Sequence, residues 1–419
     1  MREAIRHDLG SLTAMSDLVF LAPRMPLAEG RGDMRAWHML RRLAAQHRVH
    51  LGCFYDRAEQ ARHIPMLAEL CASVLCVPMW PLVRRVESAA AVLRGRAASA
   101  VPPASSRLAQ WIAQTFAEHR PDRAFVCGSS LAAYLADYRL DLLAIDMVEV
   151  GSESWRRRAE AARWPLNELY WRQERAALRR DTQTGSRAHR VFFASAAEAN
   201  LFARRAPRAL ARLAVMRNGI DLDYFSASGG GSQPNPYRPD RKTVVFAGDL
   251  DYAPHAEGAA WFANEVMTML RHRFPTIDFW MVGRRPPHTL RALAKSDIHL
   301  VRAPGDVRPY IAHADAIVAP LRVARGIANN VLEAMAMGKP VVATPAALEG
   351  LDFALGEEVL CAASAPAFAT AVATVLGGRA AGMGARGQRR VEAQYGWSAV
   401  LQPLDNFAPP ADAKLAHAS

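Results

Sequence analysis

The chain has 419 residues, of which 51% are hydrophobic and 22% are charged, and its formal net charge is +12. This length predicts two or three compact units with enough apolar material for sizeable cores. Ordinary glycine, proline and aromatic contents exclude a collagen-like, low-complexity or wholly disordered chain. The five cysteines show no CxxC spacing, so they indicate neither a disulfide framework nor a structural zinc site.

Short apolar runs alternate with amphipathic segments along the whole chain, which is the pattern of βαβ units and parallel sheets. In the first half the expected strands cover residues 17–22, 48–54, 73–78, 123–127, 142–146 and 190–194. In the second half they cover residues 242–248, 277–283, 298–301, 315–321 and 339–344. The sequence therefore predicts an α/β protein with two doubly wound domains.

The domain boundaries follow from one break in this pattern. Residues 226–239 are rich in glycine and proline and fit neither a helix nor a central strand. We expect an N-terminal domain over 1–220, a linker over 221–241 and a C-terminal domain over 242–395. A helix and tail over 396–419 are expected to pack back on the N-terminal domain. The sequence has no run of 18 apolar residues and no signal-peptide pattern at its start, so we expect a cytoplasmic location.

The excess of positive charge lies in the first half of the chain. Residues 1–220 hold 33 Lys+Arg against 21 Asp+Glu, which is +12, whereas residues 221–419 hold 19 of each. Such asymmetry predicts an anionic partner, either a nucleic acid or an acidic membrane surface. Two basic amphipathic segments, 82–96 and the arginine- and aromatic-rich stretch from Ser154 to Arg180, are candidates for a membrane face. The alternative explanation of the excess positive charge is a general compositional bias toward arginine.

The segment 320–344 carries the clearest chemical signal. A strand ends at Leu321, a loop contains Gly326, and a helix is expected to begin near Ile327. A helix N-terminus presents free amides and partial positive charge, which suit a diphosphate. Glu333 follows two turns into this helix among apolar neighbours, where its carboxylate can accept both hydroxyls of a ribose.

Two aspartates in the first half are further candidates. Asp146 follows an apolar run that is expected to be a strand, and open α/β sheets bind ligands at the carboxyl ends of their strands, so Asp146 is a candidate for ligand contact. Asp33 precedes an amphipathic helix and fits a helix N-cap, with a role in the site as the alternative.

Together with residues 217–225, 244–267, 279–286 and 306–321, the segment 320–344 resembles the retaining nucleotide-sugar glycosyltransferases of the GT-B fold, family four. The nearest subgroup is the sugar transferases associated with PEP-CTERM protein sorting and exopolysaccharide loci. The resemblance implies two Rossmann-like domains that face a cleft. The C-terminal domain is expected to hold the nucleotide-sugar donor, and the N-terminal domain is expected to hold the acceptor, with Asp146 as a candidate acceptor contact.

The resemblance also implies roles for individual residues. The family's paired glutamates fall on Arg325 and Glu333, so the ribose contact is kept and the first glutamate is replaced. The arginine would hold the diphosphate and stabilise the leaving group. Donor contacts are then expected from the stretch after it, which comprises Gly326, Ile327, Ala328 and Asn329.

Glycine and arginine complete the implied site. Gly248 ends a strand where the family's backbone approaches the phosphates, and Arg284 and Arg285 at the next strand end would neutralise the leaving group. Gly32 and Asp33 would belong to a loop that closes over donor and acceptor. A histidine that relatives often place after the fourth or fifth strand is replaced by serines, so no general base is assigned.

We therefore expect a cytoplasmic glycosyltransferase on the inner face of a membrane, with a lipid-linked or polysaccharide acceptor and retention of configuration. No metal and no nucleic acid are expected, because no metal cluster and no nucleic-acid module is recognisable. The alternatives are a nucleotide-sugar 2-epimerase, a non-catalytic nucleotide-sugar or polyanion binder and, on charge alone, a nucleic-acid binder.

Overall fold

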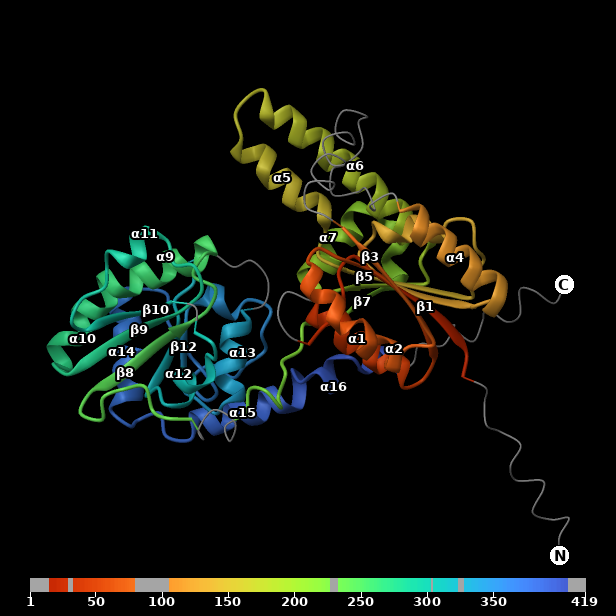
Figure 1. The fold of residues 1–419 in the computed structure, drawn as a ribbon. Helices are drawn as coiled ribbons and strands as arrows, with labels where there is room; N and C mark the ends of the chain where they lie inside the picture. The colour runs from red at the N-terminus through yellow and green to blue at the C-terminus, as the bar shows by residue number, and fades with distance from the viewer. Residues whose placement is uncertain are drawn as a thin grey trace, which may run out of the picture. The chain divides into compact units, whose positions relative to one another are not determined.

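A computed structural model gives the fold in two compact units (Figure 1). It describes residues 15–28, 33–79, 105–226, 233–302, 304–322 and 328–405. Unit 1 comprises residues 1–216 together with 401–419, and unit 2 comprises residues 217–400. The first unit thus ends four residues before the expected linker, and it takes up the chain again at Leu401 rather than at residue 396.

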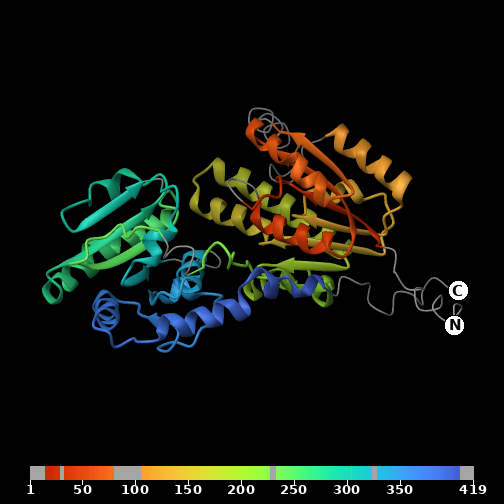
Figure 2. The same ribbon diagram turned by 60° about the horizontal axis from the view of Figure 1, so that its bottom comes forward.

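Unit 1 is built on a seven-stranded parallel sheet with the order β3-β2-β1-β4-β5-β6-β7. Figure 2 shows its strands side by side. The strands are β1 (Asp17–Ala22), β2 (Arg48–Tyr55), β3 (Ser73–Pro78), β4 (Arg123–Cys127), β5 (Leu142–Val148), β6 (Arg190–Phe193) and β7 (Leu213–Val215). The order reverses between β1 and β4, the kind of switch point at which doubly wound sheets bind ligands.

The helices of unit 1 connect these strands. They are α1 (Met34–Ala44), α2 (Ile64–Leu70), α4 (Ser106–His119), α5 (Gly151–Ala161), α6 (Leu166–Arg187) and α7 (Ala196–Arg205). Short 3₁₀ turns are η1 (Ala58–His63), η2 (Leu131–Leu135), η3 (Pro207–Arg212) and η6 (Gln402–Leu404). The segment 401–405 belongs to this unit through α1, because Arg42 of α1 forms an ion pair with Asp405.

Unit 2 is built on a six-stranded parallel sheet with the order β10-β9-β8-β11-β12-β13. Its strands are β8 (Lys242–Ala247), β9 (Ile277–Gly283), β10 (Ile298–Arg302), β11 (Ala316–Ala319), β12 (Val341–Ala343) and β13 (Leu360–Cys361). The order reverses between β8 and β11. The predicted fold class, α/β with two doubly wound parallel sheets, is therefore confirmed.

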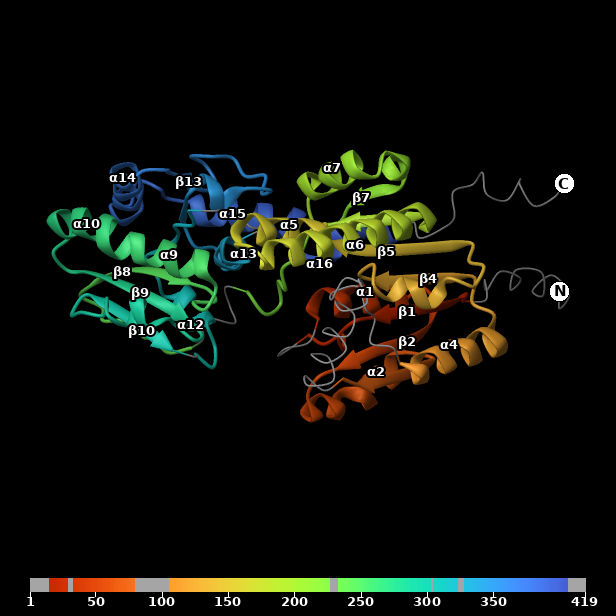
Figure 3. The ribbon, with the colours of Figure 1, turned by 90° about the horizontal axis from the view of Figure 1, so that it is seen from above.

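Both faces of the second sheet are covered by helices. Val244 and Phe246 of β8 enter one core, and Val245 and Ala247 enter another, because successive strand residues point to opposite faces. The first core includes α9 (Ala253–Trp261), the π-turn η4 (Phe262–Val266), α10 (Met267–Arg273), α11 (His288–Arg291) and α14 (Ala365–Leu376). Helices α10 and α14 lie side by side (Figure 3).

The second core of unit 2 is closed by another set of short helices. It contains α12 (Arg308–Ala312), α13 (Asn329–Ala336), η5 (Pro345–Leu348) and α15 (Met383–Gln394), and α16 (Trp397–Val400) follows α15. Within the described ranges, no helix combines the length and the apolar character that a membrane-spanning segment requires.

Candidate functional site

Two glycine turns meet at the carboxyl ends of β8 and β9 in unit 2. Gly248 follows β8, and its amide donates a hydrogen bond of 3.0 Å to the carbonyl of Val282. A Cβ on Gly283 would lie 1.9 Å from the carbonyl oxygen of Gly248, so only glycine fits at position 283. This edge therefore presents bare backbone at the side of the sheet where doubly wound domains bind ligands.

Charged side chains from both turns pair above these glycines. Nη2 of Arg284 lies 3.2 Å from Oδ1 of Asp249, and Nη1 of Arg285 lies 3.8 Å from Oδ2 of Asp251. All four side chains are exposed, so each pair contributes at most about 1 kcal/mol to stability and is readily exchanged for another partner. The two predicted arginines thus stand beside Gly248, where an anion can take the place of the aspartates.

Glu333 lies in the second turn of α13, with buried neighbours at Leu332 and Ala334. Burial raises the pKa of its carboxyl group to about 7, and the negative charge of Asp249 adds to the rise. That interaction places Glu333 close to the turn after β8. The predicted ribose partner and the predicted phosphate loop therefore belong to one region of unit 2.

The helix that carries Glu333 begins without a side-chain cap. Ala328 is its N-cap residue and cannot accept a hydrogen bond through its side chain, while Asn329 is exposed at the first position. The predicted residues Arg325, Gly326 and Ile327 immediately before it lie outside the described residues, and their roles stay predictions.

A cluster in unit 2 was missed by sequence reasoning. The guanidinium of Arg308 lies over the ring of Tyr224 at 4.1 Å, and the same arginine forms an ion pair of 2.7 Å with Asp306. The Tyr224 hydroxyl donates to Asp306 over 3.3 Å. Burial and the negative charge of Asp306 raise the pKa of Tyr224, and Glu333 contributes to the rise, so the cluster borders the Glu333 region. Tyr224 and Asp306 are 82 positions apart in the sequence, so the periodicity of the sequence cannot reveal their contact.

In unit 1, Asp33 caps a helix. Its Oδ1 accepts a hydrogen bond of 3.0 Å from the amide of Ala36, which makes it the N-cap of α1. The structural alternative for Asp33 therefore holds, and a catalytic role stays a prediction. Gly32, which precedes it, lies outside the described residues, as does the basic stretch 82–96.

Asp146 forms a buried ion pair with Arg35. Its side chain is 1% exposed, and its two oxygens accept hydrogen bonds of 2.7 and 2.8 Å from Nε and Nη2 of Arg35. Burial alone would lower the pKa of Arg35, but the adjacent carboxylate raises it. Arg35 also donates to the carbonyl of Met216 over 2.7 Å. Both oxygens are thus occupied and buried, and Asp146 anchors α1 to β5. Its role as an acceptor contact stays a prediction.

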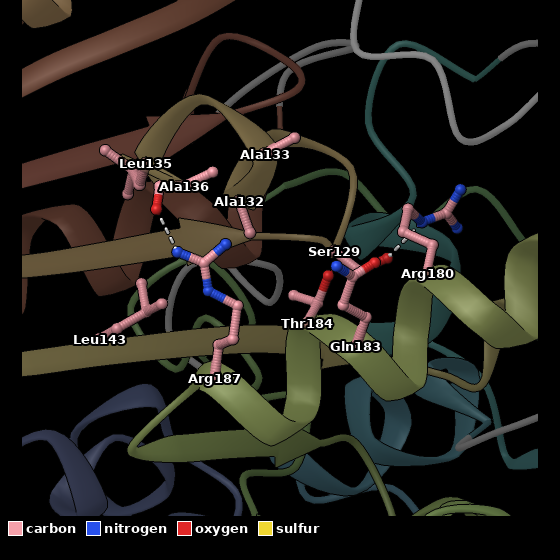
Figure 4. A pocket seen from close by; sticks show the side chains of 10 residues that line it. All are labelled: Ser129, Ala132, Ala133, Leu135, Ala136, Leu143, Arg180, Gln183, Thr184 and Arg187. Atoms are coloured by element: carbon pink, nitrogen blue, oxygen red, sulfur yellow. Dashed lines mark hydrogen bonds between the residues drawn. The ribbon is translucent and has the colours of Figure 1, made fainter. Parts of the chain in front are cut away.

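A second polar cluster lies at the carboxyl end of β4, beside a pocket of about 150 Å³ (Figure 4). Ser129 donates to Asp181 over 2.7 Å and accepts from Nε of Arg180 over 3.1 Å. Alanine and leucine side chains of η2 form the apolar wall, and Thr184 and Arg187 of α6 form the polar one. The serine that replaces the expected histidine is thus part of an Arg–Ser–Asp arrangement.

One group of side chains has the composition of a metal site. Ligand atoms of Asp17, His50 and His119 lie within 4.8 Å of one another at the amino ends of β1 and β2. Both ring nitrogens of His50 already have partners at 2.8 Å, Asp17 and Ser73. Because those bonds hold the imidazole and this edge lies opposite the strands' carboxyl ends, we assign the group a structural role. The expectation that no metal takes part stays a prediction.

Residues 241–377 match the family model described as "Glycosyl transferases group 1". No curated protein gives a significant match. A glycosyltransferase from Rickettsia africae is 13% identical with a TM-score of 0.61, covering 97% of this chain and 100% of that chain. HepE of Anabaena in complex with UDP is 14% identical with a TM-score of 0.61, covering 93% and 98%.

A third similar structure is sucrose-phosphate synthase from Thermosynechococcus elongatus, 15% identical with a TM-score of 0.61, covering 96% of this chain and 100% of that one. These likenesses show the GT-B fold over nearly the full length. The family match falls on unit 2 and includes both glycine turns and Glu333. The family match thus concerns residues 241–377 alone, and the similar structures show the fold of the whole chain.

Proposed function

We propose that this protein transfers a sugar, with retention of configuration, from a nucleotide diphosphate donor to a lipid-linked or polysaccharide acceptor. One observation carries the proposal. In unit 2, bare glycine turns, two exposed arginines and a half-buried glutamate converge at the carboxyl edge of the sheet, within the segment that matches the glycosyl transferase model. HepE, whose fold this chain shares, is seen in complex with UDP and with UDP-glucose.

The donor would be held by unit 2. Gly248 and the amides at the start of α13 would face the diphosphate, because a glycine turn lets the phosphates approach the backbone closely and a helix N-terminus favours anions. The ionised carboxylate of Glu333 would accept hydrogen bonds from two ribose hydroxyls. The stacked pair of Arg308 and Tyr224 offers a flat surface near that carboxylate for the base.

Stabilisation of the departing diphosphate is the main task of the site. Arg284 and Arg285 would leave their aspartates for the phosphates, and Arg325 would complete this neutralisation. The departing phosphate itself would take the proton of the acceptor hydroxyl, which requires no protein base. Transfer is therefore expected to persist when divalent metals are chelated.

The acceptor side and the cellular setting belong to the same proposal. Unit 1 would bind the acceptor, and its excess of arginine supports attachment to the inner face of an anionic membrane. Family four, and the subgroup that serves PEP-CTERM and exopolysaccharide loci, are supported by the motif resemblance described above.

Nucleotide binding tests the donor site. Calorimetric titration with UDP, GDP and ADP is expected to give a preferred nucleotide, and Glu333→Ala should weaken its binding about tenfold or more because the ribose loses a charged acceptor. The matched control is Glu265→Ala, an exposed glutamate of the same unit, which should bind as the wild type does. Unchanged affinity in Glu333→Ala would remove that residue from the site.

Transfer itself is tested by nucleotide release. A panel of nucleotide-sugars is incubated with a lipid-linked acceptor, released UDP, GDP or ADP is measured, and the anomeric configuration of the product is read by NMR. Nucleotide binding without release under every condition would favour a non-catalytic binder, and conversion of the nucleotide-sugar without acceptor would favour an epimerase.

A further inference from the structure

Helices α5 and α6 form a hairpin whose outer half extends beyond the sheet of unit 1 (Figure 1). The 22 residues of α6 span about 33 Å, whereas the seven residues of β5 rise only about 23 Å. The buried residues of α6 begin at Gln173, and none lies between Leu166 and that position. The first turns of α6 and the connecting loop therefore lack a core of their own.

The tip of this hairpin exposes large apolar side chains. Residues 163–166 are all exposed, with Trp164 at 79% and Leu166 at 54%. Trp164 has the largest exposed fraction of any large apolar side chain in the described ranges. Isolated exposed leucines are ordinary, but an indole and a leucine side by side at a protruding turn indicate a surface that they enter.

Arginines surround this apolar tip. Residues 155–172 hold five exposed arginines against two exposed glutamates, a local charge of +3; the arginines are Arg156, Arg157, Arg158, Arg163 and Arg172. Arg158 lies over the ring of Trp155 at 4.9 Å, so the helix also carries a tryptophan near the charged band. An anionic bilayer has a negatively charged headgroup surface over a hydrocarbon interior. The arginines would contact the headgroups, and the apolar tip residues would enter the hydrocarbon.

We infer that Trp164 and Leu166 insert into an anionic lipid bilayer and that the hairpin sets the distance between the membrane and the acceptor edge of unit 1. Helix α5 begins three residues after β5, at the edge of the sheet where ligands bind, and its 11 residues span about 16 Å. The inference rests on the proposed function. It names the acceptor as a short lipid-linked glycan whose reacting sugar lies within roughly 20 Å of the headgroups, not a released polysaccharide.

Vesicle binding tests the insertion. Full-length protein is sedimented with phosphatidylcholine vesicles that contain either no anionic lipid or about one third phosphatidylglycerol. The wild type should bind only the anionic vesicles, less at high salt, and show a blue shift of tryptophan fluorescence. The double variant Trp164→Ser, Leu166→Ser should bind at least tenfold more weakly. The control is Leu210→Ser, which removes a 62% exposed leucine of the same unit that does not belong to the hairpin tip, and it should leave binding unchanged.

Parallel assays separate failure of this inference from failure of the proposed function. Nucleotide affinity and transfer to a water-soluble short acceptor should be equal in the wild type and the double variant, while transfer to vesicle-borne acceptor should fall at least tenfold in the variant. Wild-type protein that ignores anionic vesicles, a double variant that binds them equally, or retention on single-stranded RNA in their place would overturn the inference. Loss of nucleotide binding by all proteins would instead count against the donor site alone.

Discussion

Replacing Glu333 by glutamine separates the charge of this residue from its packing in α13. Glutamine has nearly the same shape and cannot ionise, so the variant removes the charge and leaves the packing of α13 in place. In the wild type, burial and the adjacent Asp249 raise the pKa of the carboxyl group to about 7. The ionised form is therefore costly in the folded protein, and we propose that it is also the form that binds ribose.

The magnitude follows from the difference between the folded and unfolded pKa values. The step from the ordinary 4.5 to about 7 corresponds to roughly 3 kcal/mol. Because the unfolded chain releases this proton first, the free energy of unfolding falls as pH rises from about 4.5 to about 7 and is constant above that range. Glu333→Gln should thus match the wild type near pH 4 and be more stable at pH 8 by up to that amount.

Nucleotide affinity should follow the opposite course. A group with a pKa of about 7 is mostly protonated at pH 6 and mostly ionised at pH 8, so wild-type affinity should rise roughly tenfold across this interval. Urea unfolding and calorimetric nucleotide titration at four pH values measure both effects. The glutamine variant serves as the control, because any pH dependence of affinity that it keeps comes from the nucleotide and not from residue 333. Parallel curves for the two proteins, in stability and in affinity, would refute the reasoning.

Two further pairs of substitutions have outcomes that follow from the geometry. Arg35→Met leaves the buried carboxylate of Asp146 without its partner and should lower the free energy of unfolding in urea by about 3–5 kcal/mol. Arg42→Gln, in the same helix but in an exposed ion pair, should lower it by no more than about 1 kcal/mol. Equal losses in the two variants would contradict the burial of the Arg35 pair. Gly283→Ala should destabilise unit 2 by several kcal/mol or prevent its folding, because its Cβ meets a carbonyl oxygen at 1.9 Å. Gly305→Ala, where a Cβ meets nothing within 4 Å, should stay within about 0.5 kcal/mol of the wild type, and comparable thermal midpoints for the two variants would contradict this account.

Strands were predictable because doubly wound sheets bury both faces of each strand. Such strands are continuous apolar runs bounded by polar residues, and the expected ranges for β1, β3, β4 and β9 coincide with the observed ones. Strands β7 and β13 were missed. They have three and two residues, too few for a period to show, and only their neighbours in the sheet define them.

The site divides along the same line. Glu333 and Gly248 stand out in the sequence because a local pattern marks each of them, a carboxylate in an apolar helix and a glycine at a strand end. The ion pair of Arg35 with Asp146 joins residues 111 positions apart, and no local pattern in the sequence relates the two. The partners of Tyr224 were missed for the same reason, since tertiary contact alone brings them together.

The path of the chain has a consequence for its synthesis. Unit 1 is interrupted in sequence, since all of unit 2 lies between Met216 and Leu401, and the returning segment pairs with α1 through Arg42 and Asp405. A ribosome therefore releases every residue of unit 2 before it delivers the last piece of unit 1. Unit 2 can therefore fold during translation before unit 1 has received its last segment, which begins at Leu401.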